Sequence, residues 1–242
     1  MVTDEVRRIK EAYARRDSAG KSRLYSYFHP ASLFLSQQRD RATIDALRKN
    51  GFEDLKEKKI LDVGCGTGAV LRDFVKYGAR PENCYGIDLL ADRIEAARRL
   101  SPNMSFSYGD AETLRHESGY FDIVISFTLF TSILDTAMKQ NIAAEMLRVL
   151  KPGEIVLWYD YHVNNPRNPD VRGVSKREII QLFPCCAIVL KRITLAPPIA
   201  RVIAPQSFLA CYFLEKMRLF NTHYVGYIKK LGKNDTIENP AK

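Results

Sequence analysis

Short apolar runs alternate with segments of helical periodicity between residues 58 and 160. The short runs are typical of buried strands, and apolar residues every three or four positions are typical of amphipathic helices. Parallel neighbours in a sheet need crossover connections of about this length, usually helices. The alternation therefore predicts an α/β fold, a doubly wound and mostly parallel sheet with helices on both faces. The predicted strands are 59–64, 84–90, 104–111, 121–127 and 154–161, and the predicted helices include 69–79, 91–100 and 136–150.

The flanks of this region have a different pattern. Residues 1–57 hold two helical segments on either side of an aromatic cluster at 25–34, which predicts an N-terminal helical cap. After the fifth strand, Asn, Pro and Gly residues predict a long loop. Ser175 and Glu178 match a capping box, with Ser175 as N-cap and Glu178 reaching back, so a helix is expected from there to Phe183.

The last part of the chain contains an apolar segment, 196–220, between a strand expected near 186–195 and a final strand expected at 222–230. Prolines interrupt the segment, and it is too short to span a membrane. Three interpretations remain open: a lid with core-covering helices, a dimer surface, and an interfacial segment resting on a membrane.

The size of the chain predicts one domain. With 242 residues and 46% hydrophobic content, the chain can bury one core, and we expect a cap at 1–57, a ligand-binding core at 58–160 and further helices and strands at 161–242. No leader or charge-free spanning stretch is apparent, and the five cysteines lack the spacing of metal ligands or a disulfide framework. We expect reduced thiols, a cytoplasmic location and no metal.

The positive charge is concentrated in the last third of the chain. The formal net charge is +9, and residues 161–242 carry 13 Lys and Arg against 5 Asp and Glu. Such a surface favours phosphate-bearing substrates, anionic headgroups or nucleic acid, or it is only a solvated face.

A glycine-rich bend, LDVGCGTG at residues 61–68, follows the first predicted strand. Gly64, Gly66 and Gly68 allow a sharp turn into the next helix and a close approach of a ligand to the main chain. This signal alone is weak, because Gly64, Gly66 and Ala69 also satisfy the dinucleotide pattern G-x-G-x-x-G/A.

Two acidic residues, Asp62 and Asp110, help to distinguish between the ligands that this bend could bind. A dinucleotide lays its pyrophosphate on the helix start, where Asp62 would add unfavourable negative charge, even though Asp88 stands at a suitable distance for a ribose. A ligand with an ammonium and a sulfonium group would be favoured by Asp62. Asp110, at the end of the third predicted strand, adds a further acid at the same edge of the sheet.

The motifs LDVGCGTG, GIDLL, GDAETL, FDIVIS and RVLKPGE stand in this order and at spacings that resemble the class I S-adenosylmethionine-dependent methyltransferases that act on small molecules. The resemblance covers about residues 57–160. One departure is Glu154, where the family usually has a second glycine, at a position far from the cofactor. The resemblance implies S-adenosyl-L-methionine as cofactor, S-adenosyl-L-homocysteine as product and methyl transfer by in-line displacement.

The resemblance also implies a set of cofactor contacts. Asp62 would face the methionyl ammonium, Asp88 would accept from both ribose hydroxyls, and Asp110 would accept from the adenine amino group. The remaining contacts would come from Gly64, Cys65, Gly66, Gly68, Leu89, Ala111, Ser126 and Phe127. Each of the acids can also be a turn or helix cap.

A hydroxyl acceptor would gain from a general base, whereas an amine acceptor would need none. His162 is the first candidate for the base because imidazole titrates near neutrality, and Asp160 is the second. Acceptor-binding candidates lie in the cap, at the ends of the fourth and fifth strands and in the long loop: Tyr25, Tyr27, His29, Thr131, Ser132, Tyr159, Tyr161, Arg167 and Arg172.

The leading hypothesis is a methyltransferase for a hydroxyl or amine of a small molecule, including a phosphate-bearing, sugar or lipid-linked acceptor, with peripheral membrane contact as an open option. No nucleic-acid methylation motif is present. Two alternatives stay open: a non-catalytic S-adenosylmethionine-binding subunit and an NAD(P)-dependent oxidoreductase. The sequence leaves the acceptor atom and the oligomeric state undetermined.

Overall fold

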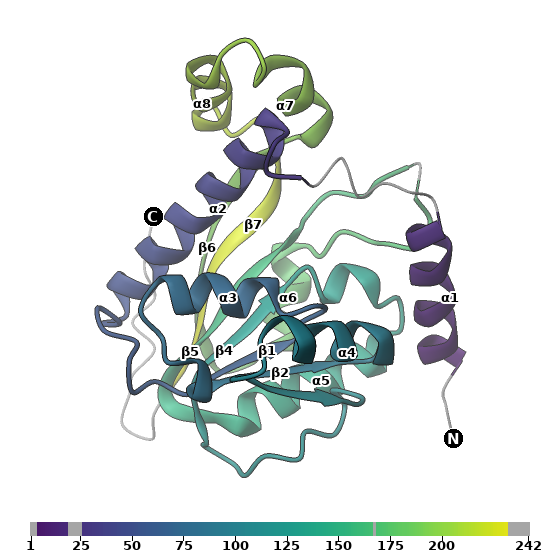
Figure 1. Ribbon diagram of the computed structural model, residues 1–242, viewed down its shortest axis with the longest axis vertical. Coiled ribbons are helices and arrows are strands. Elements are labelled where there is room, and N and C mark those ends of the chain that lie inside the picture. The colour runs from purple at the N-terminus through teal and green to yellow at the C-terminus, as the bar shows by residue number, and fades with distance from the viewer. Residues whose placement is uncertain (1–3, 19–25, 167, 232–242) are drawn as a thin grey trace.

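The computed structural model describes residues 4–18, 26–166 and 168–231, and these form a layered α/β structure (Figure 1). The sheet has the strand order β3-β2-β1-β4-β5-β7-β6, in which only the pairs made by β7 are antiparallel. The strands are β1 (Ile60–Val63), β2 (Cys84–Asp88), β3 (Ser105–Tyr108), β4 (Phe121–Phe127), β5 (Leu150–Tyr161), β6 (Cys186–Leu195) and β7 (Asn221–Lys230). The predicted fold class is confirmed.

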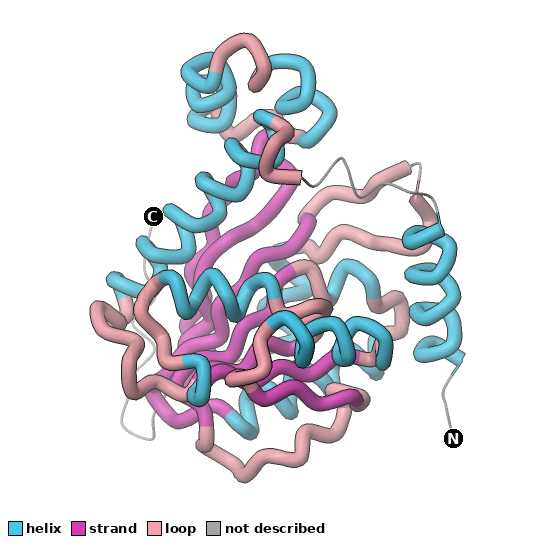
Figure 2. The backbone as a smooth tube through the Cα atoms, viewed as in Figure 1, coloured by secondary structure: helices cyan, strands magenta, loops and turns pink. Residues whose placement is uncertain are grey.

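Helices cover both faces of the sheet, as Figure 2 shows in front of the strands and behind them. The α-helices are α1 (Asp4–Ser18), α2 (Pro30–Lys49), α3 (Ala69–Lys76), α4 (Ala91–Leu100), α5 (Thr136–Val149), α6 (Lys176–Leu182), α7 (Pro197–Ile203) and α8 (Phe208–Lys216), with short 3-10 turns η2 (Pro81–Asn83) and η3 (Phe130–Ser132). Helices α1, α5 and α6 share one apolar core with one face of the sheet, and α2, α3 and α4 share another with the opposite face. None of the helices in the described residues is long and apolar enough to cross a bilayer.

The largest differences from the predicted elements lie at their ends. β5 begins at Leu150, four residues before the predicted start, because Leu150 pairs with Phe121 before a register shift brings Ile155 opposite Ile123. Gly153, with φ +80°, supplies the backbone conformation within that irregular stretch.

Helix α2 also begins earlier than the pattern indicated, inside the aromatic cluster. Its N-cap is His29, whose Nδ1 accepts a hydrogen bond from Ala31 N at 3.2 Å, and Pro30 occupies the first turn. A ring nitrogen in this capping role and a proline at the helix start explain the boundary.

The predicted capping box is half right. Ser175 is the N-cap of α6 and accepts from Glu178 N at 3.1 Å. Glu178 does not reach back, since its carboxylate accepts from Lys139 Nζ at 2.7 Å and from Arg172 at 3.2 Å. Lys139 is fully buried. A charge-assisted hydrogen bond from this buried cation stabilises the Glu178 carboxylate more than a hydrogen bond from the exposed N-cap amide would.

Candidate functional site

The glycine bend joins β1 to α3 in a left-handed backbone conformation at alternate residues. Gly64, Gly66 and Gly68 have φ values of 78°, 53° and 77°. Gly64 N and Cys65 N donate to Ile87 O at 2.8 and 3.1 Å, which ties the bend to the end of β2.

The three glycines differ in what a side chain would meet. A Cβ on Gly64 would lie 2.9 Å from Leu129 Cδ1, and one on Gly68 would lie 2.7 Å from Phe106 Cζ. A Cβ on Gly66 would meet no atom of the described residues within 4 Å. The main chain at Gly66 therefore borders open space, which a Cβ would begin to fill.

Asp88 holds the bend from the end of β2. Its Oδ2 accepts from Gly66 N at 2.8 Å, and its Oδ1 accepts from Leu90 N at 2.9 Å. Burial raises the pKa of Asp88, and these two backbone donors act against that rise. Each carboxylate oxygen has a second lone pair, so Asp88 can accept further hydrogen bonds from a ligand.

Asp62 lies on β1 just before the bend and is only 2% exposed. Its Oδ2 has no hydrogen-bond partner among the described residues. Burial, with a smaller contribution from the negative charge of Asp88, raises the pKa of Asp62 to about 8, and the nearby Arg39 acts in the opposite direction. A buried carboxyl group of this kind is costly to ionise without a partner, so the position suits a cationic ligand.

The ends of β2 and β3 lie together. Gly109 N donates to Asp88 O at 3.1 Å, and Asp110 Oδ1 accepts from Glu112 N at 2.9 Å in an Asx turn. Ala111 is buried beside them, and Leu89 is half-buried and packs on the core. The structure therefore places Leu89, Asp110 and Ala111 at one edge of the sheet.

Ser126 and Phe127 end β4 but point to opposite faces of the sheet, because successive strand residues alternate. Phe127 belongs to the core on the α2 and α3 side and packs on Tyr159 with ring centroids 5.5 Å apart. Ser126 is fully buried, and its hydroxyl meets no partner within the described ranges. The two predicted contacts therefore do not share a face.

The candidate bases are both engaged by the protein. His162 is half-buried, its Nε2 lies 3.0 Å from Asn221 O, and burial lowers its pKa. Asp160 is fully buried and accepts from Thr131 N at 3.0 Å and Tyr161 N at 2.8 Å, while burial raises its pKa to about 7. Asp160 faces the α5 side of the sheet, opposite to its neighbour Tyr159.

The predicted acceptor residues divide into two groups. Thr131, Ser132 and Arg172 lie together, because Thr131 Oγ1 donates to Arg172 O at 3.0 Å and Arg172 N donates to Thr131 O at 2.9 Å. In the cap, the His29 ring accepts from Ala31 N at the start of α2, and Tyr27 is 56% exposed. Tyr25 and Arg167 lie outside the described residues.

Helix α1 is fixed across the strand ends, a contact that sequence periodicity did not locate. Tyr13 Oη lies 3.0 Å from Ser132 Oγ, and Lys10 Nζ donates to Tyr108 Oη at 3.1 Å. Arg8 Nη2 donates to Ser132 O at 2.7 Å. These contacts add Tyr13 as a candidate for the acceptor side.

A stack of aromatic rings lies beyond β4 on the Asp62 face. His223 on β7 stacks on Tyr159 at 4.5 Å between centroids and lies 3.8 Å from the centroid of Tyr161. Burial lowers the pKa of His223 to about 3, so its imidazole is neutral, and Nδ1 lies 2.9 Å from Thr222 Oγ1.

Arg39 reaches the same face from α2. It donates to Asp73 at 2.7 Å and to Asp40 at 3.2 Å. Its positive charge opposes the rise that burial causes in the pKa of Asp62 and in the pKa of Tyr159. No sequence motif marked Arg39 or His223, because helix packing and an antiparallel strand bring them here.

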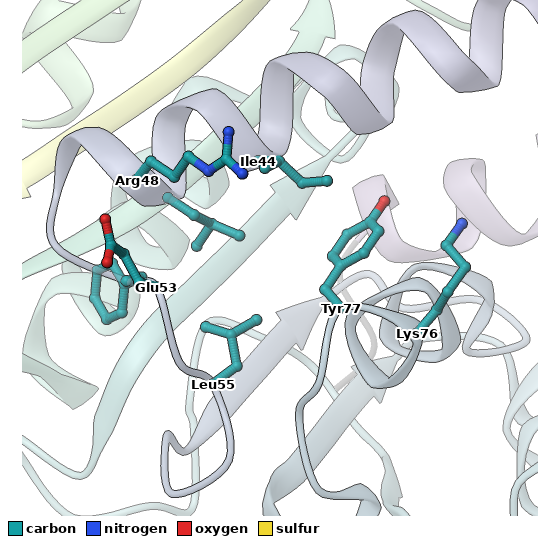
Figure 3. Close-up of a pocket in the computed structure, with 8 residues that line it drawn as sticks. Ile44, Arg48, Glu53, Leu55, Lys76 and Tyr77 are labelled. Carbon is teal, nitrogen blue, oxygen red and sulfur yellow. The ribbon is translucent and has the colours of Figure 1, made fainter.

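A surface hollow of about 720 Å³ lies elsewhere, between the second half of α2 and the end of α3 (Figure 3). Figure 3 shows Tyr77 and Lys76 across it from Ile44 and Arg48. It is at the opposite end of α3 from the glycine bend, so we assign it no part in the chemistry. Within the described residues, no group of three or more His, Cys, Asp and Glu side chains is arranged to hold a metal ion.

Residues 60–153 match the family model described as a methyltransferase domain. The match covers about two fifths of the chain, from β1 to the first residues of β5. The matched range includes the glycine bend, Asp62, Asp88 and Asp110, and it ends before the aromatic stack.

Curated relatives are similar over part of their length. The norajmaline N-methyltransferase of Rauvolfia serpentina is 31% identical over 54% of this chain and 47% of that protein. The 2-methyl-6-phytyl-1,4-hydroquinone methyltransferase of Synechocystis is 35% identical over 51% of this chain and 38% of that protein. The chain thus spans less than half the length of these relatives.

Solved structures share the fold. One, described as a putative sarcosine dimethylglycine methyltransferase from Galdieria sulphuraria, has a TM-score of 0.60 at 16% identity, over 81% of this chain and 86% of that chain. At this identity the similarity supports the fold alone.

The residues of this methyltransferase domain fit the cofactor that its family implies. Asp62 offers a buried carboxyl group with an unpaired oxygen to an ammonium, and Gly66 leaves the space that a bound molecule needs beside the main chain. Asp88 and Asp110 keep lone pairs for hydroxyl and amino donors.

Proposed function

We propose that this chain is an S-adenosylmethionine-dependent methyltransferase for a small-molecule acceptor with a hydroxyl or amine group. The observation that carries the proposal is the unpaired Oδ2 of buried Asp62 beside the open side of Gly66. When bound, S-adenosylmethionine would supply an electrophilic methyl group that the acceptor attacks in line, with S-adenosylhomocysteine as the leaving group.

The residues at the strand ends bind and orient. Asp62 pairs with the ammonium, Asp88 accepts from the ribose hydroxyls, and Asp110 with Ala111 and Leu89 holds the adenine. The bend of Gly64, Cys65, Gly66 and Gly68 forms the wall beside the methionyl chain. Fixing the two reactants in this way contributes most of the rate, because positioning converts a bimolecular step into one within a complex.

The acceptor side is formed by β4, β5, β7 and the two N-terminal helices. Tyr161 lies half-buried against the buried rings of Tyr159 and His223, and Ser132 with Tyr13 provides hydroxyls that can orient a polar group. Helix α1 covers the strand ends and excludes water. The excess of positive charge in residues 161–242 supports an acceptor that bears a phosphate or a lipid-linked phosphate.

A hydroxyl acceptor needs a group that takes its proton, and two histidines lie at this end of the sheet, each with one ring nitrogen in a hydrogen bond to the protein. His162 and His223 both have lowered pKa values, so each is a neutral imidazole at pH 7. Variants His162→Ala and His223→Gln separate them: loss of turnover with unchanged cofactor affinity identifies the base, and full activity in both variants favours an amine acceptor.

The cysteines support a reducing, cytoplasmic location. All five are free in the structure, and burial raises the pKa of four of them, Cys65, Cys84, Cys186 and Cys211. Unreactive buried thiols of this kind persist in the cytoplasm without a structural role as disulfides.

The first experiment is calorimetric binding of S-adenosylmethionine and S-adenosylhomocysteine, with Asp88→Ala and a matched variant, Glu95→Ala, in which an exposed acid on α4 is removed. We expect micromolar binding, a loss of about a hundredfold in Asp88→Ala from missing charge-assisted hydrogen bonds, and no change in Glu95→Ala. Absence of binding by the folded protein would refute the proposal. Binding without turnover of any acceptor class would favour a non-catalytic subunit, and binding of NAD(P) instead would favour an oxidoreductase.

A further inference from the structure

Helices α7 and α8 carry a cluster of exposed apolar side chains that the proposed reaction does not use. Leu209 and Phe213 of α8 and its C-cap residue Met217 recur every four residues and so share one helix face. Leu209 and Phe213 are 79% and 66% exposed. Leu219 follows at 72% exposed, and Val202 on α7 is also exposed. We call these five residues the apical face.

The apical face is held outward by packing on its inner side. Ala200, Ala204 and Cys211 are buried against Phe34 of α2, and Phe34 meets Phe208 edge-on at 5.7 Å. The apolar residues of α7 and α8 thus form two sets: an inner set that packs on α2 and an outer set that is exposed to solvent. An exposed apolar cluster of this extent on a packed helix marks an interaction surface.

The charges around the apical face have one sign. Residues 26–39 contain no Asp or Glu, and residues 190–220 contain one, Glu215. Glu215 is buried and accepts from Thr194 N at 2.8 Å, so its carboxylate points into the protein. The cations at the rim include Lys216 and Arg218, which are exposed, and Arg201 on α7.

The apical face lies at the functional end of the sheet. Helices α7 and α8 connect β6 to β7, and Ala196 N donates to Phe220 O at 2.8 Å to close the connection. The first residues of β7 pair with the end of β5, since His223 lies opposite Tyr161. Figure 1 shows α7 and α8 at the top of the view, beside the start of α2.

We propose that the apical face docks the protein on a lipid bilayer that contains anionic lipids. Leucine and phenylalanine side chains enter the boundary between headgroups and acyl chains, while the rim of arginine and lysine pairs with lipid phosphates. A second copy of the chain fits this surface less well. A two-fold contact would bring the cations of both copies together, and residues 26–39 and 190–220 offer no acid other than the buried Glu215 to pair them. Docking would hold the ends of the parallel strands close to the membrane.

The test is co-sedimentation of the whole protein with vesicles of phosphatidylcholine alone and of phosphatidylcholine with about a third phosphatidylglycerol, at low and high salt. The variants are Leu209→Ser with Phe213→Ser, and Lys216→Gln with Arg218→Asn, in which asparagine tolerates the φ of 60° at position 218. Leu100→Ser, which removes an exposed leucine from α4, is the matched control.

We expect binding to the anionic vesicles that weakens with salt. The apolar pair of substitutions should reduce it by at least about tenfold, and the charge pair by about fivefold for each cation removed. The control should bind like the parent protein. Absence of vesicle binding by the folded protein would overturn the proposal, and so would a dimer in sedimentation velocity that the apolar pair abolishes. Calorimetry of S-adenosylmethionine on the same variants keeps this result separate from the methyl-transfer proposal, because the apical face does not include the cofactor contacts.

Discussion

The cofactor side and the acceptor side of the site are built by different means. On the cofactor side the contacts reach the main chain of the glycine bend from the neighbouring loop, as between Gly66 N and the Asp88 carboxylate, 22 residues apart. On the acceptor side the side chains of α1 reach distant segments, as between Tyr13 and Ser132, 119 residues apart, or Arg8 and the main-chain oxygen of Asp170, 162 apart. The first side therefore depends on the local shape of the chain, and the second depends on how the helices dock.

The largest effect should come from closing the space beside the main chain at the bend. Gly66→Ala places a methyl group where the cofactor would lie, and we expect an affinity loss of about a hundredfold or more with a stability cost of about 1 kcal/mol for the left-handed backbone. Gly51→Ala is the matched control, since Gly51 has φ +78° and an equally open Cβ position. Calorimetry of both variants measures the loss of cofactor affinity, and thermal unfolding measures the loss of stability. Equal affinities in Gly66→Ala and the parent protein would contradict the assignment.

Asp62 should show opposite effects on binding and stability. Its pKa is raised from 3.8 to about 8, so the native state binds more protons than the unfolded state between these values and stability falls as the pH rises through them. Asp62→Asn removes this penalty, and we expect it to be more stable than the parent by about 1 to 3 kcal/mol above pH 8, with no difference below pH 4. Denaturant unfolding of both proteins from below pH 4 to above pH 8 tests the sign of this stability difference. The same variant should lose cofactor affinity, and a gain in affinity would contradict the role of Asp62.

Binding of S-adenosylmethionine at pH 7 should release up to about one proton. Asp62 is mostly protonated at that pH, and the ammonium of the ligand stabilises its ionised form. Calorimetric enthalpies measured in buffers of different ionisation enthalpy give the proton count directly. The release should disappear in any residual binding by Asp62→Asn, and an unchanged count there would assign the proton to another group.

A smaller effect is expected on the acceptor side. Tyr13→Phe removes the hydroxyl that meets Ser132, a loss of about 1 kcal/mol or a few-fold in the acceptor KM. The cofactor Kd should stay the same, because the hydroxyl that is removed meets Ser132, which is not one of the proposed cofactor contacts. Lys10→Gln, which breaks a more exposed contact of α1 with Tyr108, is the control for a general loosening of the helix. A change in cofactor Kd with an unchanged acceptor KM would contradict the assignment of Tyr13 to acceptor binding.

Much of the cofactor side was predictable because strand, bend and helix are consecutive in the chain. The residues of the glycine bend and the acids at the strand ends lie where the alternation of apolar and helical segments predicted them, at one edge of a parallel sheet. Their roles toward a ligand remain predictions. The acceptor side was less predictable, since Ser126 and Phe127 are adjacent in sequence but face opposite sides of the sheet, and Asp160 is turned into the core.

The sequence by itself determined the α/β class, the order of the central elements and the similarity of residues 60–153 to a methyltransferase domain. These features follow from short-range periodicity and from motifs within single loops. Only the tertiary structure decided that β7 runs antiparallel between β5 and β6 and brings His223 onto Tyr159, that α2 carries Arg39 to Asp62, and that α1 crosses the strand ends. It also decided which residues of the 196–220 segment pack inward and which face the solvent. The physical reason is that packing free energy is gained between surfaces distant in sequence, and periodicity indicates which side of an element is apolar without indicating its partner.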